Sequence, residues 1–203
     1  FVSRVGSLCD KIVIYSRDEV KQARMRQDFP ADNLRWLIGD VRDQQRLARA
    51  MNGIDVVVHA AAMKRIDACA HNPDEALKTN VNGTMNAVEA AMQAGVQKFV
   101  FLSTDKAFEP ISIYGNSKAA AESMVLAANN ISGQAGTRFA ATRYGNVWMS
   151  TGSVAPTWLE QLKAGKPLTI TDPDCTRFFM TANEAVDMVW KTIQTMTGGE
   201  LHI

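Results

Sequence analysis

The chain has 203 residues, of which 46% are hydrophobic and 21% charged, and its 22 basic and 21 acidic residues leave a formal net charge of +1. This composition is ordinary for a globular protein with one good core, and the balanced charge gives no reason to expect nucleic acid or an anionic membrane as a partner. No apolar run approaches the roughly 18 residues of a membrane-spanning helix. The three cysteines lie far apart and form no Cys-x-x-Cys, which favours a reduced, cytoplasmic setting.

Short β-branched runs alternate with longer helical patterns, which predicts βαβ units around a parallel sheet. Several runs are apolar at consecutive positions, as expected when helices cover both faces of a sheet. The expected strands are "KIVIY" (11–15), "RWLIG" (35–39), "DVVVHAA" (55–61), "KFVFLS" (98–103) and "RFAATRYGN" (138–146). Apolar residues recur every three or four positions in the expected helices, at 16–29, 41–53, 72–95 and 117–130. The fold class is therefore α/β, a Rossmann-like doubly wound parallel sheet.

The character of the chain changes after residue 147, where short proline-containing segments alternate with two helical patterns. We expect residues 1–147 to form the Rossmann-like domain and residues 148–203 a smaller part that leans on the sheet. The chain begins at Phe1 and ends in "GGELHI", which is typical of the start of a strand. We therefore expect a fragment of a longer protein, which leaves an upstream membrane anchor open.

A dinucleotide site needs a Gly-rich first turn, and this chain contains no G-x-G-x-x-G. "KIVIYSRDE" is typical of the second strand of such a fold, and the first strand lies in the middle of the sheet. A fold without that strand would leave an open seam of unpaired backbone groups. We therefore expect the first strand and its Gly-rich loop to precede Phe1, rather than a variant that binds no nucleotide.

The end of this second strand indicates which cofactor is bound. Enzymes that use NAD place an Asp or Glu there to accept from the ribose 2′-hydroxyl. Here Ser16 and Arg17 supply a hydroxyl and a guanidinium that suit a 2′-phosphate, and we group Lys21 with them. Asp18 follows directly and keeps the acidic alternative open. The sequence predicts NADP over NAD.

Two further stretches fit the same site. "GDVRD" places Asp40 and Val41 at a strand end, where a carboxylate and an apolar contact can hold adenine. "HAAA" places Ala60 and Ala61 where a ribose or pyrophosphate can approach the backbone. His59 is more typical of a core histidine than of a ligand, and the other histidines are remote, so we expect no metal site.

The stretch "STDKAFEPISIYGNSK" (103–118) carries two proton-transfer pairs. Tyr114 and Lys118 form a Tyr-x-x-x-Lys pattern, in which a neighbouring ammonium lowers the pKa of the phenol and makes it a base. Thr104, at the strand end, can hydrogen-bond the same substrate hydroxyl. Asp105 and Lys106 add a second acid and a second base, for which a surface loop pair is the alternative explanation.

Five motifs occur in the order "GDVRD", "HAAAMKR", "TNVNGT", "STDKA…YGNSK" and "RYGNV". Together they resemble the extended short-chain dehydrogenase/reductase superfamily, and within it the UDP-N-acetylglucosamine 4,6-dehydratases (inverting) and their capsular-polysaccharide relatives. That family oxidises C4 of the hexose, removes the acidified proton at C5, expels the C6 hydroxyl as water and returns the hydride to C6. One pair serves the redox step and the other the elimination.

The resemblance implies a role for each residue. Tyr114 would be the C4 hydroxyl base and Lys118 its electrostatic partner and ribose anchor, while Lys106 would be the C5 base and Asp105 the proton donor to the C6 hydroxyl. These last roles need Lys106 neutral and Asp105 protonated for part of the time, against the effect of an Asp–Lys ion pair. The resemblance implies that four residues contact the UDP-sugar: Lys64, Asn146, Thr171 and Arg177. It implies a structural role for Asn80.

Two other functions remain open at this stage. A UDP-N-acetylhexosamine 4-epimerase uses the same Tyr and Lys but does not need the Asp–Lys pair, and a non-catalytic nucleotide-sugar-binding protein needs neither. The resemblance favours inversion at C5, surface polysaccharide or flagellin glycan biosynthesis as the context, and a homo-oligomer.

Overall fold

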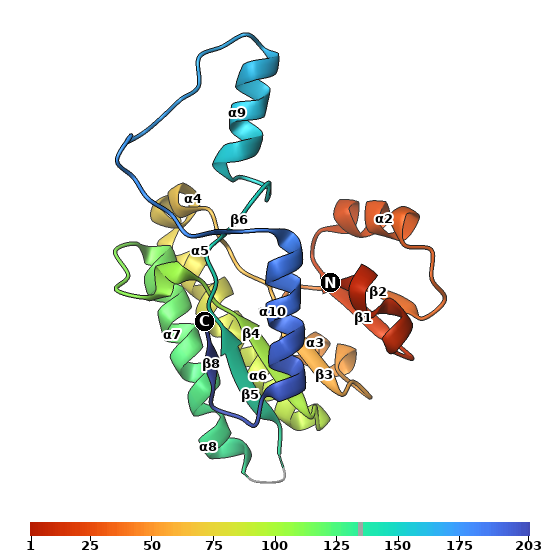
Figure 1. Ribbon diagram of the computed structural model, residues 1–203. Helices are drawn as coiled ribbons and strands as arrows, with labels where there is room; N and C mark the ends of the chain where they lie inside the picture. Colours follow the sequence, from red (N-terminus) through yellow and green to blue (C-terminus); the bar gives the residue numbers. More distant parts are fainter. Residues whose placement is uncertain (134–135) are drawn as a thin grey trace.

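The computed structural model describes residues 1–133 and 136–203, and its strands are all parallel (Figure 1). The strands are β1 Ile12–Ser16, β2 Leu34–Ile38, β3 Val56–His59, β4 Lys98–Leu102, β5 Arg138–Thr142, β6 Asn146–Val147, β7 Phe179–Met180 and β8 Leu201–His202. The α-helices are α1 Val2–Val5, α2 Glu19–Asp28, α3 Gln44–Ala50, α4 Ile66–His71, α5 Pro73–Leu77, α6 Gly83–Ala94, α7 Ile113–Ala127, α8 Asn129–Ser132, α9 Val154–Lys163 and α10 Ala182–Thr195. Two 3₁₀ turns, η1 (Gly6–Leu8) and η3 (Asp105–Ala107), and a π-helical turn, η2 (Lys78–Asn82), complete the elements.

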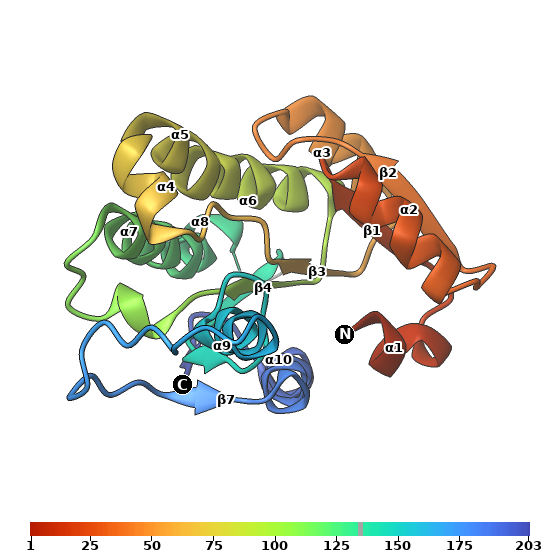
Figure 2. The ribbon, with the colours of Figure 1, turned by 90° about the horizontal axis from the view of Figure 1, so that it is seen from above.

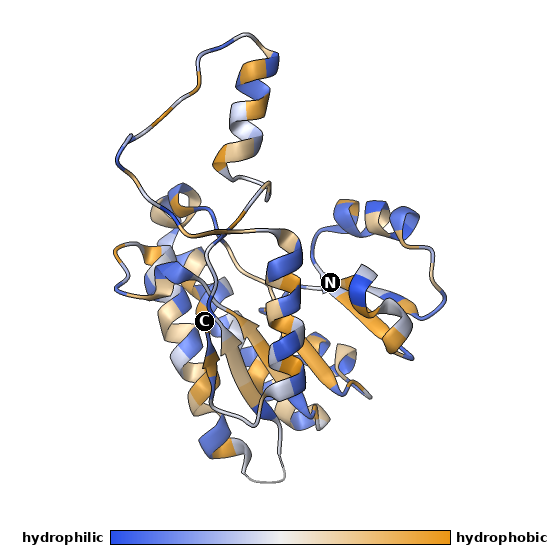
Figure 3. Ribbon diagram, viewed as in Figure 1, coloured by the Kyte–Doolittle hydropathy of each residue, from blue (hydrophilic) through white to orange (hydrophobic). Residues whose placement is uncertain are grey.

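The main sheet has the strand order β3-β4-β5-β8. Its central strand, β4, sends alternate side chains to opposite faces, as the period of a strand requires. Phe99 and Phe101 pack under α3, α6 and α7, whereas Val100 packs with Val189 and Ile193 of α10. The two helical layers lie on opposite sides of the sheet (Figure 2). Hydrophobic residues concentrate on the strands between the two layers (Figure 3). Because helices cover both faces of the sheet, β4 is apolar at every position from 99 to 102.

β1 and β2 form a separate two-stranded sheet, beside which α2 lies (Figure 1). No strand among the described residues lies between β1 and β3, which is where the expected strand order places the first strand of the fold. The doubly wound α/β fold expected from the sequence is confirmed, and each of the five expected strands is present.

The residues after 147 lie in two places. Only the stretch from α9 to residue 178 extends away from the sheet (Figure 1). α10 returns to cover one face of the main sheet, and β8 pairs with β5 through Ala141 and Thr142. Residues 182–203 therefore pack as part of the sheet layer.

The helix expected over residues 72–95 is interrupted. α5 and α6 are joined by η2, in which the wider π turn adds a residue to the helix path. Asn72 directly precedes α5, but its side-chain amide donates to the Ala68 carbonyl at 3.1 Å instead of capping the helix. Gly53 and Gly95 have φ of 68° and 71° and follow α3 and α6, near the ends of the expected helices.

Candidate active site

The first half of the candidate site follows β4 and continues into α7. Thr104 caps η3, and Ser112 caps α7 by accepting from the Gly115 amide at 3.1 Å. Gly115 is needed at this point, since a Cβ there would lie 2.3 Å from the Lys106 carbonyl oxygen. This close approach brings Tyr114 beside the Asp105–Lys106 turn.

Asp105 and Lys106 form an ion pair at the centre of the site. The Lys106 amine donates to Asp105 Oδ1 at 2.9 Å and to Asn146 Oδ1 at 2.8 Å. The Thr104 hydroxyl donates to the same Asp105 oxygen at 2.9 Å. Both charged side chains are largely covered, with 22% of Asp105 and 29% of Lys106 exposed. This is not the geometry of a solvated loop pair, whose long side chains are free to move.

The connection from β5 to β6 forms the opposite wall. The Asp105 amide donates to the Tyr144 carbonyl at 3.0 Å, which fixes η3 to this connection. Gly145 lets β7 approach, because a Cβ there would lie 2.5 Å from the Phe178 carbonyl oxygen. The next residue, Asn146, holds Lys106 through its side chain and β7 through its backbone. Sequence reasoning assigned Asn146 to the substrate and missed its contact with Lys106.

Tyr114 and Lys118 lie one turn apart on α7, and burial decides the protonation of both. Burial raises the pKa of Tyr114 to about 12, while a hydrogen bond with the Thr104 hydroxyl acts in the opposite direction. Burial lowers the pKa of Lys118 to about 7, against the attraction of Glu122. The Lys118 amine donates to the Leu102 carbonyl at 2.6 Å and lies 3.9 Å from the Phe101 ring centre.

The electrostatic effect of Lys118 on Tyr114 that the sequence pattern predicts stays a prediction. Lys118 is not among the groups that shift the pKa of the phenol, and that pKa moves up instead of down. The sequence pattern places the two residues on one helix face but does not reveal how deeply the helix buries them.

Asn80, on the π-helical turn, joins α7 to the loop after β3. Its side-chain oxygen accepts from the Met63 amide at 2.7 Å, and its side-chain nitrogen donates to Met63 O at 3.0 Å and to Ser117 Oγ at 2.9 Å. Ser117 in turn donates to the Tyr114 carbonyl at 2.8 Å. Lys64 is exposed, and its amine donates to the Thr151 carbonyl at 2.8 Å. The structural role expected for Asn80 is confirmed.

The end of β1 holds the residues expected at the cofactor ribose. Asp18 caps α2 by accepting from the Lys21 amide at 2.9 Å, and the Ser16 hydroxyl accepts from the Asp18 amide at 3.2 Å. The hydrogen bond from the Lys21 backbone is the main cause that lowers the pKa of Asp18. Arg17 is exposed and touches Asp40 at 3.5 Å. The Asp18 carboxylate is thus occupied in capping α2, and the Arg17 guanidinium points toward the end of β2.

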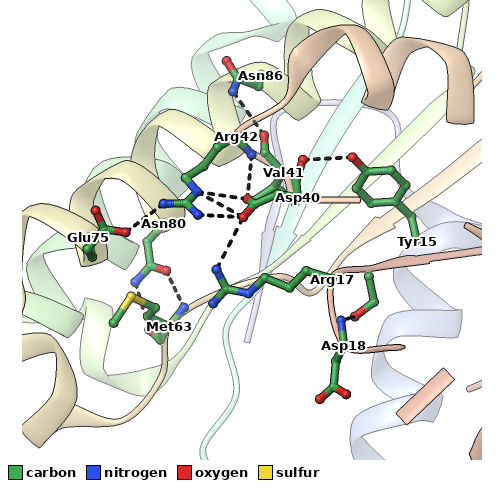
Figure 4. A network of polar contacts seen from close by, with 11 residues as sticks. Tyr15, Arg17, Asp18, Asp40, Val41, Arg42, Met63, Glu75, Asn80 and Asn86 are labelled. Carbon is green, nitrogen blue, oxygen red and sulfur yellow. Dashed lines mark hydrogen bonds and ion pairs between the residues drawn. The ribbon is translucent and has the colours of Figure 1, made fainter. Parts of the chain in front are cut away.

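Arg42 is the residue at this end of the sheet that sequence reasoning missed (Figure 4). Its guanidinium donates to both carboxylate oxygens of Asp40, and on the other side to Glu75 Oε2 at 2.7 Å. Its hydrogen bonds are the main cause that lowers the pKa of Asp40. The Asp40 side chain, expected to hold adenine, is thus already paired. The signal in the sequence for this ion pair was that Arg42 follows Asp40 by two residues in "GDVRD".

The remaining residues expected at the cofactor are Ala60, Ala61 and Val41, and they differ in exposure. Ala60 is exposed and Ala61 half-buried at the end of β3, which leaves the backbone accessible. The Val41 side chain is only 8% exposed and belongs to the main core, where it packs on Gly83. Its backbone carbonyl accepts from Asn86 Nδ2 at 3.1 Å. The Val41 side chain is therefore too buried to make the expected apolar contact with adenine.

His59 is a buried core residue, as expected. Its Nε2 lies 3.1 Å from the Thr84 hydroxyl, and its ring stacks on Phe101. Burial lowers the pKa of His59 to about 3, so the imidazole is neutral. Among residues 1–133 and 136–203, no group of three or more His, Cys, Asp and Glu side chains is arranged to hold a metal ion.

Thr171 and Arg177 are not brought to the site in this structure. Both are exposed on the stretch between α9 and β7, and the Arg177 guanidinium donates to the Thr176 carbonyl at 2.6 Å. In the part of the chain that the structure describes, no helix combines the length and apolar character needed to cross a membrane.

Comparison with known proteins places this geometry in a family. The profile of the family described as "Polysaccharide biosynthesis protein" matches residues 3–203. The chain belongs to that family. The resemblance carried by "STDKA" and "RYGNV" is thereby confirmed.

Proteins that are similar to this chain include sugar-nucleotide enzymes. The chain is 47% identical to the UDP-N-acetylglucosamine 4,6-dehydratase (inverting) of Campylobacter jejuni, over 96% of this chain and 58% of that protein. It is 43% identical to the UDP-glucose 4-epimerase of Rickettsia prowazekii, over 95% of this chain and 57% of the relative. It thus spans less than two thirds of these curated relatives.

Among solved structures, Pen from Bacillus thuringiensis superposes with a TM-score of 0.95 at 37% identity, over 98% of this chain and 64% of Pen. DesIV, a dTDP-glucose 4,6-dehydratase from Streptomyces venezuelae solved with NAD and TYD, gives a TM-score of 0.86 at 24% identity, over 95% of this chain and 65% of DesIV. The second likeness shows the fold alone.

Proposed function

We propose that this protein removes water from UDP-N-acetylglucosamine to give a UDP-4-keto-6-deoxy-N-acetylhexosamine, with NADP as its redox cofactor. The observation that carries the proposal is the half-buried Asp105–Lys106 pair beside Tyr114. A redox reaction at C4 alone needs one proton-transfer pair, whereas an elimination needs an additional base and acid. The name of the C. jejuni relative supports the same reaction.

The residues present fit the ribose side of NADP. The exposed Arg17 guanidinium and the Ser16 hydroxyl suit a 2′-phosphate, because Arg binds phosphate oxygens in a bidentate manner. Asp18 is engaged in capping α2, which weakens the case for NAD. Asp40, Val41, Ala60, Ala61 and Lys21 complete the proposed contacts. When bound, NADP supplies the hydride acceptor for C4 and the hydride donor for C6.

The residues of this chain divide the proton transfers between them. Tyr114 takes the proton of the C4 hydroxyl, and Lys118, buried beneath it, holds the cofactor ribose. Lys106 takes the proton from C5, and Asp105 gives a proton to the departing C6 hydroxyl. Asn146 holds the Lys106 amine from the opposite wall at 2.8 Å, so that the base is fixed from two sides.

Four residues are proposed to bind the substrate. Lys64 and Asn146 would contact the sugar or its phosphates, and Thr171 and Arg177 would bind the uridine and diphosphate after the stretch that carries them approaches the site. We further propose inversion at C5, a cytoplasmic location, a homo-oligomeric assembly, and a role in making surface polysaccharide or flagellin glycans.

The second candidate is 4-epimerisation, which the 43% identical Rickettsia relative favours by its name. Incubation with UDP-N-acetylglucosamine, followed by mass spectrometry and proton NMR, separates the two reactions. Dehydration gives the loss of one water and a C6 methyl signal, and the product's ring couplings report the C5 configuration. Epimerisation gives an unchanged mass.

Two variants sharpen this experiment. Lys106→Ala is expected to abolish dehydration, whereas Lys191→Ala, an exposed lysine on α10, is the matched control and is expected to keep it. A product of unchanged mass from both variants would support the epimerase. Binding of the UDP-sugar without any turnover by the unmodified protein would support a non-catalytic sugar-nucleotide-binding protein.

A further inference from the structure

A polar side chain of α2 is buried against the sheet formed by β1 and β2. Gln22, on the first turn of this helix, is 5% exposed and is the buried residue of α2. Glutamine is mostly exposed in proteins, and a buried amide is unfavourable unless its hydrogen bonds are made. A hydrogen-bonding group thus stands where a helix ordinarily packs an apolar residue against its sheet.

The Gln22 amide joins the ends of the two strands. Its Nε2 donates to the Ser16 carbonyl at 3.0 Å and to the Leu37 carbonyl at 2.9 Å. Ser16 is the last residue of β1, and Leu37 is the last but one of β2. Because the side-chain nitrogen carries two hydrogens, one glutamine satisfies both carbonyls and fixes the two strand ends relative to each other.

The same strand ends carry the charges that face the proposed cofactor. Arg17 directly follows β1, and Asp40 lies two residues after β2. The Arg17 guanidinium is 3.5 Å from the Asp40 carboxylate (Figure 4). A guanidinium attracts a 2′-phosphate and a carboxylate repels it, so the net effect depends on where each strand end holds its side chain.

We propose that Gln22 is a positioning residue for cofactor selection, which holds the ends of β1 and β2 so that Arg17 and the Ser16 hydroxyl meet the 2′-phosphate of NADP. This inference rests on the proposed cofactor. Gln22 acts through these two residues, because both hydrogens of its amide are used by the strand carbonyls.

The peptide unit between Ser16 and Arg17 transmits the effect. Its carbonyl is the one that Gln22 holds, and the unit is planar, so a rotation of the carbonyl moves the Arg17 backbone with it. Without the glutamine amide, the Ser16 carbonyl keeps only the Gly39 amide, at 3.2 Å, among the partners in the described part of the chain. A carbonyl that loses a buried donor turns toward water, and Arg17 is then displaced from the phosphate.

A matched arrangement at the opposite end of the same sheet provides the control. The Asn33 side-chain amide donates to the Gly6 and Cys9 carbonyls, each at 2.8 Å. Asn33 directly precedes β2 and is remote from the strand ends that carry Arg17 and Asp40. Gln22→Met and Asn33→Leu each replace an amide that bridges two carbonyls by an apolar side chain of similar shape, and only the first does so beside Arg17.

Calorimetry compares 2′,5′-ADP with 5′-AMP, which lacks the 2′-phosphate. Gln22→Met should weaken binding of 2′,5′-ADP about tenfold, the effect of a lost hydrogen bond to a charged group, and leave 5′-AMP unchanged. Gln22→Asn keeps an amide on a shorter side chain and should lie between the two, and it serves as the test if Gln22→Met does not fold. Asn33→Leu should bind both nucleotides as the unmodified protein does.

A second readout follows the phosphate itself. In ³¹P NMR of the saturated complexes, the 2′-phosphate resonance should be the same in the unmodified protein and in Asn33→Leu, and should move toward that of the free nucleotide in Gln22→Met. An unchanged ratio of the two affinities in Gln22→Met, an unmoved resonance, or the same change of ratio in Asn33→Leu would overturn the inference. If the unmodified protein binds 2′,5′-ADP no more tightly than 5′-AMP, the proposed preference for NADP itself fails, and the role of Gln22 with it.

Discussion

The close approach at Gly115 provides a quantitative test of how the site is assembled. A Cβ at this position would lie 2.3 Å from the Lys106 carbonyl oxygen and 3.0 Å from Pro110 Cβ. In Gly115→Ala the η3 turn must therefore move away from α7 by about 1 Å, since interiors are close-packed and the first neighbour is backbone. Tyr114 and the Asp105–Lys106 pair would then be separated by that amount.

The two consequences of this movement differ in size. Overpacking costs about 1–3 kcal/mol of the free energy of unfolding, and replacing Gly by Ala in a helix returns about 1 kcal/mol. The net loss of stability is therefore expected at about 0–2 kcal/mol, which leaves the protein folded. A misplacement of about 1 Å, in contrast, is expected to lower the dehydration rate about 100-fold.

The assay compares initial rates of product formation with urea unfolding of the same protein. Gly6→Ala is the control, because a Cβ at Gly6 meets nothing within 4 Å. It should leave the rate unchanged and should not lower the unfolding midpoint. An unchanged rate in Gly115→Ala would refute the argument that this contact sets the geometry of the site, and so would a loss of rate no larger than the unfolded fraction explains.

Three further predictions concern charges. Burial lowers the pKa of Lys118 to about 7 from its ordinary value of 10.5. Between pH 7 and pH 10.5, Lys118 is therefore neutral in the folded protein and charged in the unfolded chain. The free energy of unfolding should thus rise between pH 7 and pH 10.5 by up to about 1.4 kcal/mol per pH unit, and Lys118→Met should flatten this slope. Glu122→Gln leaves the Arg143 guanidinium without its buried carboxylate, and should lower the free energy of urea unfolding by about 3–5 kcal/mol. Arg42→Met should weaken binding of 2′,5′-ADP about tenfold and leave 5′-AMP unchanged, because the released Asp40 carboxylate repels a 2′-phosphate, as calorimetry can measure.

Each of these has an outcome that would contradict it. Equal pH slopes in the unmodified protein and in Lys118→Met would mean that another group titrates. Replacement of both Glu122 and Arg143 by Met should recover much of the lost stability, and a double variant as unstable as the single one would point to lost packing instead. Equal weakening of both nucleotides by Arg42→Met would show a general loss of the binding surface.

The layered fold was predictable because the signals that specify it are local. β4 carries apolar residues at consecutive positions, and Gly95 follows α6 with a positive φ that few other residues tolerate. The π-helical turn at residues 78–82 was not predictable, since its sequence continues the apolar period of the helices on either side. What distinguishes it is tertiary: Asn80 contacts Met63 and Ser117, which are distant in sequence.

The candidate site was predictable in its residue types but not in its contacts. Asp105, Lys106 and Tyr114 stand in one short stretch, so their proximity follows from the chain itself. The contact between Asn146 and Lys106 spans 40 residues and depends on the alignment of β4 with β5. The pKa of Tyr114 depends on depth of burial, which no spacing of residues records.

The backbone bond between Asp105 and Tyr144 has a consequence for how the chemistry proposed for this site can change over evolutionary time. A main-chain amide and carbonyl hold η3 in place, as a second such bond from Ser103 to the Thr142 carbonyl holds the end of β4. Apart from proline at position 103 or 105, which lacks the donating N–H, no substitution of a side chain removes the groups that form either bond. The positions after β4 therefore keep their place whichever acids, bases or hydroxyls occupy them. A scaffold of this kind can in this way change its chemistry through two adjacent side chains.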